Sequence, residues 1–294
     1  MITSNVALWR DRRGRFSPVR AATLALLIAP AVALVWFSIQ HDLGPRPRTE
    51  AIHEVGLWSV RFLLLTLFVT PIRRIARYAP LVDVRRMLGV GCYAYIALHL
   101  VLYIADQTFN IGTVVSEIVL RYYLTIGFTA WVGLAVLAAT SNDYMVRRLG
   151  GLRWRKLHRL VFPVAVLGSV HYFMQSKLEV FEPTVVGGIF IWLMLYRVLH
   201  WRYPRNTEFP MWVIAASWFV VGGLVFIGEA VGFWIAFHAP ILRVLVLDFN
   251  FEAGIRPGWY VWGIGVLVTA IGLWRTKPRE TWLPFLSGRP SGAG

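Results

Sequence analysis

Long apolar stretches, separated by short polar and basic connections, form the dominant pattern of this chain. A helix needs about 20 mostly apolar residues to cross the hydrocarbon core of a bilayer. The stretches that approach or reach this length predict spanning helices at 21–40, 53–71, 87–105, 122–140, 157–175, 183–200, 210–228 and 258–274. The sequence therefore predicts an all-α integral membrane protein, a polytopic bundle of about eight transmembrane helices.

The basic residues predict which ends of these spans face the cytoplasm. With residues 1–20 inside, most of the 30 Lys and Arg residues fall on the inner side, chiefly before the first span, at 73–86 and at 147–159. Inner loops of membrane proteins are enriched in these two residues. We therefore expect both termini to be cytoplasmic. The first span has no convincing cleavage site, so we interpret it as an uncleaved anchor.

The stretch 229–247 does not fit this simple pattern. It is long enough to cross a bilayer, but Pro240 and Arg243 interrupt it. A further crossing here would also place the basic residues at 275–279 on the outer side, against the bias of the other connections. We therefore expect an extracytoplasmic interfacial or re-entrant segment.

Composition supports a membrane protein and narrows its chemistry. Hydrophobic residues make up 57% of the chain and charged residues only 15%, while the net charge is +15. The basic residues lie in short clusters between apolar stretches, which favours the anionic face of a lipid bilayer over nucleic acid as their partner. A single cysteine, Cys92, excludes an internal disulfide, a CxxCH haem attachment site and cysteine-based metal clusters.

Four histidines are the main candidates for chemistry. His99 and His171 lie in the outer halves of two different predicted spans, His53 lies at the outer mouth of a third, and His158 lies at an inner end. Ionisable groups inside a membrane are costly and indicate function. Two imidazoles at matching depth suit the axial positions of a haem iron. A proton relay or an ion site in a transporter is the competing interpretation.

The interval from His158 to His171 leaves a second question open. Thirteen residues correspond to about 20 Å of helix rise, which suits two redox centres stacked across a bilayer. On an ideal helix, however, the two rings would point roughly 140° apart. Either Pro163 and Gly168 locally rewind the helix, or the two histidines serve different sites.

Four stretches carry a resemblance to a known family. In chain order they are HEVGLWSVRFLLLTLFVTPIRR from His53, RRMLGVGCYAYIALHLVLY from Arg85, RYYLTIGFTAWVGLAVLAATS from Arg121 and WRKLHRLVFPVAVLGSVHYF from Trp154. With them the chain resembles the haem-binding membrane subunit of the periplasmic protein-methionine-sulfoxide reductase system, the MsrQ family, within the ferric-reductase-like transmembrane superfamily. The resemblance covers roughly residues 20–203.

The resemblance implies a function and a set of site residues. His99, His158 and His171 match the haem-ligand positions of the family, and His53 matches a recurrent histidine. The family implies haem b, FMN as a further cofactor, and electrons from the quinone pool. It also implies a partner, a periplasmic molybdopterin subunit that reduces methionine sulfoxide in oxidised proteins. The chain would then be an electron-transfer subunit in the bacterial inner membrane, not the catalytic subunit.

The chain departs from the usual form of that family after residue 205. We expect a cytoplasmic segment at 1–20, a ferric-reductase-like haem-binding core at 21–205, a two-helix membrane extension at 206–280 and a disordered tail at 281–294. No GxGxxG motif follows a strand-like run. We therefore expect the electron donor to be a quinol or a separate protein.

Two outer arginines complete the candidate site. Arg61 and Arg121 would be placed to pair with haem propionates, because guanidinium binds carboxylate in a bidentate manner; the alternative is that they only reach the membrane interface. Three further alternatives to the family's function stay open: a b-type cytochrome subunit of another dehydrogenase or metal reductase, a proton-coupled transporter, and a non-redox membrane scaffold.

Overall fold

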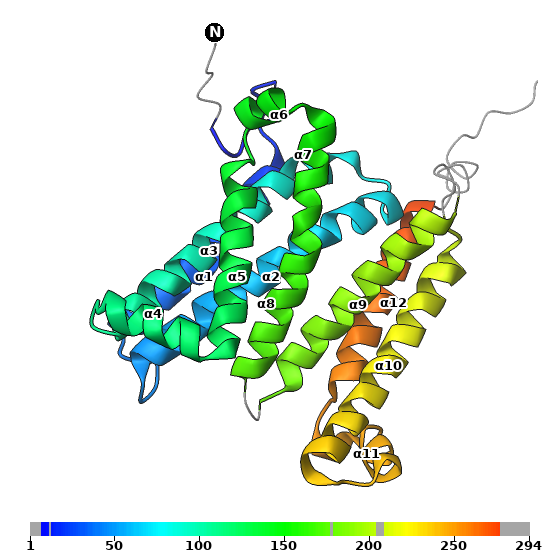
Figure 1. Cartoon of the computed structure of the whole chain (residues 1–294). Coiled ribbons are helices and arrows are strands. Elements are labelled where there is room, and N and C mark those ends of the chain that lie inside the picture. Colours follow the sequence, from blue (N-terminus) through cyan, green and yellow to red (C-terminus); the bar gives the residue numbers. More distant parts are fainter. Residues whose placement is uncertain (1–6, 12, 177–178, 204–208, 277–294) are drawn as a thin grey trace, which may run out of the picture.

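The computed structural model describes residues 7–11, 13–176, 179–203 and 209–276, and its regular elements are helices (Figure 1). The predicted tail at 281–294 lies outside the described residues. The elements are α1 (Pro18–Ile39), α2 (Pro47–Ile75), η1 (Ala79–Val84), α3 (Arg85–Asp106), α4 (Ile111–Leu120), α5 (Tyr122–Ala139), α6 (Asp143–Leu149), α7 (Gly151–Leu157), η2 (His158–Leu160), α8 (Val161–Gln175), α9 (Phe181–Arg202), α10 (Met211–Phe237), α11 (Ile241–Leu247), η3 (Phe251–Ala253) and α12 (Pro257–Thr276).

All eight predicted spans are confirmed as helices. In the part of the chain that the structure describes, 8 helical stretches are long and apolar enough to cross a membrane. They are α1, α2, η1 with α3, α5, α7 through α8, α9, α10 and α12. The protein is therefore an all-α, multi-pass membrane protein.

Helix α2 lies at the centre of the bundle. Half of its most apolar window is buried inside the protein, against 11% for α1. It packs against α1, α3, α8, α9 and α12, and its Phe62 and Leu67 side chains have no exposed surface. Helices α2, α3, α5 and α8 form a closed ring, because α2 contacts α3, α3 contacts α5, α5 contacts α8 and α8 contacts α2.

The C-terminal helices form a second layer beside this ring. Helices α9, α10 and α12 pack against one another, and α9 joins them to α2 and α8 (Figure 1). The indoles of Trp192 on α9 and Trp218 on α10 stack with centroids 4.1 Å apart, and Trp192 donates to the Ser217 hydroxyl at 2.9 Å. Glycines bring α10 and α12 close together: a Cβ at Gly222 would clash with the Trp262 indole.

The expectation for 229–247 is corrected in its first half. Residues up to Phe237 continue α10 without a break, so they do not begin a separate segment. The helix ends at His238, which adopts a left-handed conformation with φ 55°, shortly before Pro240. A proline disfavours the helical conformation of the residue before it, which here is Ala239. Pro240 is the first proline after residue 210, so α10 can run uninterrupted until just before it. Only the short helix α11 then remains of the predicted segment.

The fifth span is also not one regular helix. Helix α7 ends at Leu157, a 3₁₀ turn covers His158–Leu160, and α8 begins at Val161. Pro163 therefore lies in the first turn of α8, where backbone N–H groups have no helical acceptor, so the missing N–H of proline costs no hydrogen bond. This turn breaks the simple phase relationship between His158 and His171.

The helices place two chemically different ends on the bundle. We call the end with α6, α7 and the arginines between 73 and 86 the basic side, and the end with α4 and α11 the cavity side (Figure 1). The assignment of the basic side to the cytoplasm stays a prediction.

Candidate functional site

A cavity of about 200 Å³ lies within the ring of helices near the cavity side. Residues from α2, α3, α5 and α8 line it, and Ile118 of α4 closes one edge. Three of the seven histidines of the chain are among the lining residues: His53, His99 and His171. The structure thus brings together three of the four histidines that the sequence singles out.

His99 is held by the neighbouring helix. It projects from α3, and its Nδ1 lies 2.8 Å from the backbone carbonyl oxygen of Ile52 on α2. A carbonyl oxygen only accepts hydrogen bonds, so Nδ1 carries the proton and donates it. The Nε2 atom of His99 then keeps its lone pair, which is the form in which an imidazole binds a metal.

His171 is held in the same way on the other side of the ring. It projects from α8, and its Nδ1 lies 2.8 Å from the carbonyl oxygen of Tyr123 on α5. The same argument protonates Nδ1 and leaves Nε2 as a lone-pair donor. The two imidazoles therefore come from different helices, line one cavity and share one tautomer.

The donor set fits haem better than a bare metal ion. Among the described residues, no group of three or more His, Cys, Asp and Glu side chains is arranged to hold a metal ion. Structural zinc needs four protein ligands and catalytic zinc usually needs three, whereas haem supplies its own equatorial nitrogens and asks the protein for at most two axial ligands. Two neutral imidazoles in one membrane cavity meet that requirement.

The remaining walls of the cavity also suit a porphyrin. Ile96, Leu100 and Leu124 supply aliphatic surface, and Phe128 and Trp131 stack with an interplanar angle of 11°. Polar groups from Thr49, His53, Asp106 and Gln175 lie at the ends of their helices, towards the cavity side. Apolar walls with a few polar groups at one end match a flat macrocycle that carries charged groups on one edge.

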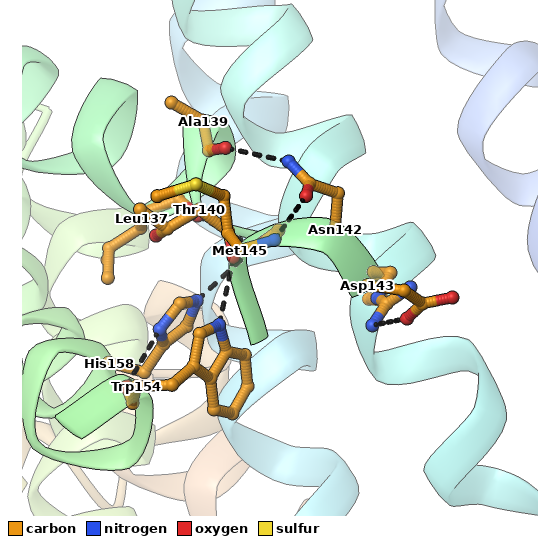
Figure 2. Close-up of polar contacts among 10 residues, drawn as sticks. Leu137, Ala139, Thr140, Asn142, Asp143, Met145, Trp154 and His158 are labelled. Atoms are coloured by element: carbon orange, nitrogen blue, oxygen red, sulfur yellow. Dashed lines mark hydrogen bonds and ion pairs between the residues drawn. The ribbon is translucent and has the colours of Figure 1, made fainter. Parts of the chain in front are cut away.

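His158 lies elsewhere, at the basic side. Its Nε2 is 3.3 Å from the Ser141 hydroxyl, its Nδ1 is 3.2 Å from the Trp154 carbonyl oxygen, and its ring stacks on the Trp154 indole at 3.8 Å. Figure 2 shows both rings against the turn that follows α5, where the indole N–H donates to the Thr140 carbonyl at 2.8 Å. Both ring nitrogens of His158 thus have polar partners, and the residue does not line the cavity.

Arg61 and Arg121 are not among the residues that line the cavity, and their expected pairing with propionates stays a prediction. Arg61 of α2 forms an ion pair with Glu182 of α9, and its guanidinium lies 4.7 Å from the centroid of the Trp58 ring. Arg121 pairs with Glu117 and donates to the Tyr123 hydroxyl at 3.1 Å. Because each arginine has an acidic partner of its own, we do not assign either of them to a cofactor.

Sequence reasoning missed several features of this cavity. The carbonyl oxygens of Ile52 and Tyr123 leave no trace in residue types, since every residue has one. Trp131 and Gln175 resemble ordinary membrane aromatic and helix-end residues, so they gave no separate signal. Asp106 was detectable in principle, because an acidic residue ends the span that carries His99.

Known proteins match a large part of this chain. The model of the ferric reductase like transmembrane component matches residues 55–169, which include His99 and His158. A protein-methionine-sulfoxide reductase heme-binding subunit MsrQ from Rhodospirillum rubrum is 40% identical over 194 residues, covering 65% of this chain and 89% of that protein. MsrQ of Herminiimonas arsenicoxydans is 34% identical, over 65% of this chain and 88% of its own. MsrQ of Caulobacter vibrioides is 36% identical, over 62% and 87%. No solved structure matches the chain.

Proposed function

This chain belongs to the MsrQ family of heme-binding subunits of protein-methionine-sulfoxide reductase, and we propose that it holds haem b between His99 and His171 and transfers electrons across a bacterial inner membrane. The observation that carries the proposal is the pair of imidazoles in one cavity, each with its Nδ1 bonded to a carbonyl oxygen at 2.8 Å. Both axial positions of the iron would then be occupied by protein ligands. Such a haem transfers electrons and does not bind oxygen.

The proposed direction of electron flow runs from the basic side to the cavity side. A quinol of the membrane pool would be oxidised to quinone near the basic side, releasing two electrons and two protons. A periplasmic molybdopterin-containing subunit would dock at the cavity side and use two electrons and two protons to reduce a methionine sulfoxide to methionine and water. The names of the relatives support a methionine-sulfoxide reductase as partner, whereas the quinol and the molybdopterin enter the proposal from the resemblance alone.

His158 would shape the inner site instead of binding the cavity haem. Its hydrogen bonds to Ser141 and to the Trp154 carbonyl, together with the stacked indole, hold the ring at the basic side. An imidazole there is placed to accept a proton from a bound quinol. FMN, which the resemblance also implies, enters the proposal from the family alone.

The proposal divides the chain into two units. The segment 21–205 would be the haem-binding core, and 206–280 an extension of two membrane helices that docks on α9. His53, at the rim of the cavity, would face the docked reductase because its side chain is exposed there.

The proposal is tested with the purified full-length chain. A reduced-minus-oxidised absorption spectrum, with haem and flavin quantified against protein, should show a b-type haem in the native chain. His99→Ala and His171→Ala should each lose it. His238→Ala is the matched control, because that histidine is exposed at the end of α10 and does not line the cavity. A native chain without haem, or full haem in both cavity variants, would reject the assignment.

A further inference from the structure

Two glycines lie directly against the two cavity imidazoles. A Cβ atom at Gly56 of α2 would lie 2.8 Å from Nδ1 and 3.0 Å from Cε1 of His99. A Cβ atom at Gly127 of α5 would lie 2.7 Å from both Nδ1 and Cε1 of His171 and 3.0 Å from its Cγ. Non-bonded carbon atoms in proteins are in contact at about 3.5–4.0 Å. Any side chain at either glycine would therefore displace the ring.

The two glycines occupy equivalent places in the hydrogen-bonding arrangement. Each stands four residues after the residue whose carbonyl accepts from the imidazole: Gly56 after Ile52, and Gly127 after Tyr123. Residues four apart lie on the same face of a helix, one turn above each other. The imidazole thus packs against one turn of the neighbouring helix, with its Nδ1–Cε1 edge nearest to the glycine and the carbonyl oxygen at its Nδ1.

Backbone conformation does not explain these glycines. Neither has a positive φ, and both lie inside regular helices, where glycine is less favourable than alanine. Other helical glycines lie under aromatic rings, as Gly258 does under Phe226, but at Gly56 and Gly127 the ring is an imidazole that lines the cavity. Gly168, three residues before His171 on α8, has no atom within 4 Å of the position a Cβ would take.

We propose that Gly56 and Gly127 are positioning residues for the haem iron, each clearing the space in which a ligand imidazole bonds to the neighbouring helix and aims Nε2 into the cavity. The inference rests on the proposed haem site and adds residues to it that lie outside the ligand set. The same arrangement of glycine, carbonyl oxygen and imidazole occurs twice, once between α2 and α3 at His99 and once between α5 and α8 at His171. Groups that orient metal-binding histidines typically change metal affinity by about 10- to 100-fold when they are altered.

The test compares three alanine variants of the full-length chain. Gly56→Ala and Gly127→Ala should each weaken haem retention by about 10- to 100-fold and shift part of the remaining haem from the low-spin to the high-spin absorption spectrum. Gly127→Ala should be the more severe, because three ring atoms lie within 3.0 Å of its added methyl group and only two at Gly56. Gly168→Ala should keep the native haem content and spectrum.

A second pair of variants separates this steric effect from a general packing role. In a His99→Ala background the ring above Gly56 is gone, so adding Gly56→Ala should not lower folding yield or thermal stability, and the better helix propensity of alanine should raise stability slightly. If Gly56→Ala lowers the stability of the double variant as much as that of the native chain, the glycine serves helix packing and the inference is wrong.

The two proposals fail in different ways. A native chain without haem rejects the proposed function. A native chain with haem, together with Gly56→Ala and Gly127→Ala variants that match Gly168→Ala in haem content and spectrum, rejects only the role of the glycines.

Discussion

Arg61 on α2 and Glu182 in the first turn of α9 form an ion pair that joins the ring of four helices to the second layer. The arginine Nε donates to Glu182 Oε1 at 3.1 Å, and the second carboxylate oxygen accepts from the Tyr172 hydroxyl at 3.2 Å. The Trp58 ring covers the guanidinium at 4.7 Å. The pair therefore links α2, α8 and α9, and explains an intramembrane arginine without a cofactor.

Arg61→Met should lower stability without removing haem. The side chains of Arg61 and Glu182 are 34% and 39% exposed, so the loss should be modest, about 0.5–1.5 kcal/mol. Thermal unfolding in detergent, followed together with the haem-to-protein ratio, measures both effects. Glu182→Gln is the control, because it alters the same ion pair. If Arg61→Met loses haem and Glu182→Gln does not, Arg61 has a direct role at the cofactor.

His158→Ala should leave the cavity haem in place and slow its reduction severalfold when a quinol is the donor. The reason is that His158 lies against Ser141 and Trp154 at the basic side and does not line the cavity. Stopped-flow reduction of the purified chain by a soluble quinol gives the rate, and the spectrum gives the haem content. Trp154→Phe is a useful companion, since it keeps an aromatic ring against His158 but removes the N–H that donates to Thr140. Loss of the cavity haem in His158→Ala would contradict this placement.

Arg256→Met should destabilise the C-terminal extension strongly. The guanidinium of Arg256 lies 2.9 Å from Glu229 of α10 and 3.2 Å from Asp248 at the end of α11, whose side chains are 6% and 0% exposed. Each carboxylate has one further oxygen that is buried and has no hydrogen-bond partner. Breaking a buried ion pair from one side typically costs about 3–5 kcal/mol, so thermal unfolding should begin at a clearly lower temperature. An unchanged unfolding curve would show that the carboxylates are satisfied without Arg256.

The stability of this region should also depend on pH through Asp248. Burial raises the pKa of this carboxyl above its ordinary value of 3.8, against the smaller lowering effect of Arg256. Between 3.8 and the raised pKa, the folded chain holds a proton that the unfolded chain has released. Stability should therefore fall as pH rises through this window, by at most about 1.4 kcal/mol per pH unit.

Asp248→Asn isolates that contribution. The difference in unfolding free energy between the native chain and this variant should change with pH above 3.8, whereas the contributions of groups distant from Asp248 cancel. A difference that stays constant from pH 4 to pH 7 would show that burial does not perturb Asp248.

The spans and the histidine pair followed from the sequence because both depend on properties of single residues. Hydropathy alone locates the eight spanning helices of the described residues, since lipid requires long apolar helices. The cost of burying an ionisable group in lipid singles out His99 and His171. The sequence predicts that the seventh span ends at residue 228, because Pro240 and Arg243 are read as interruptions of one segment at 229–247. Both residues lie beyond the end of α10, which runs through Glu229 to Phe237.

The remaining features depend on partners that are far away in the chain. Arg61 pairs with Glu182, which lies 121 positions later in the chain, and no periodic pattern in the sequence predicts this contact. The glycines below the two imidazoles are similar: Gly56 and Gly127 are recognisable only when α3 and α8 are in place beside them. The 3₁₀ turn at His158 shows that a regular helix is a poor guide to the direction of a side chain near a span end.

The most direct test of the central claim is the low-temperature EPR spectrum of the oxidised, purified chain. If His99 and His171 clamp one iron, the native chain shows a single low-spin ferric signal of the bis-imidazole type at the cavity haem, and each alanine variant loses it, through loss of haem or conversion to high spin. A low-spin signal of unchanged shape and intensity in both His99→Ala and His171→Ala would contradict the account.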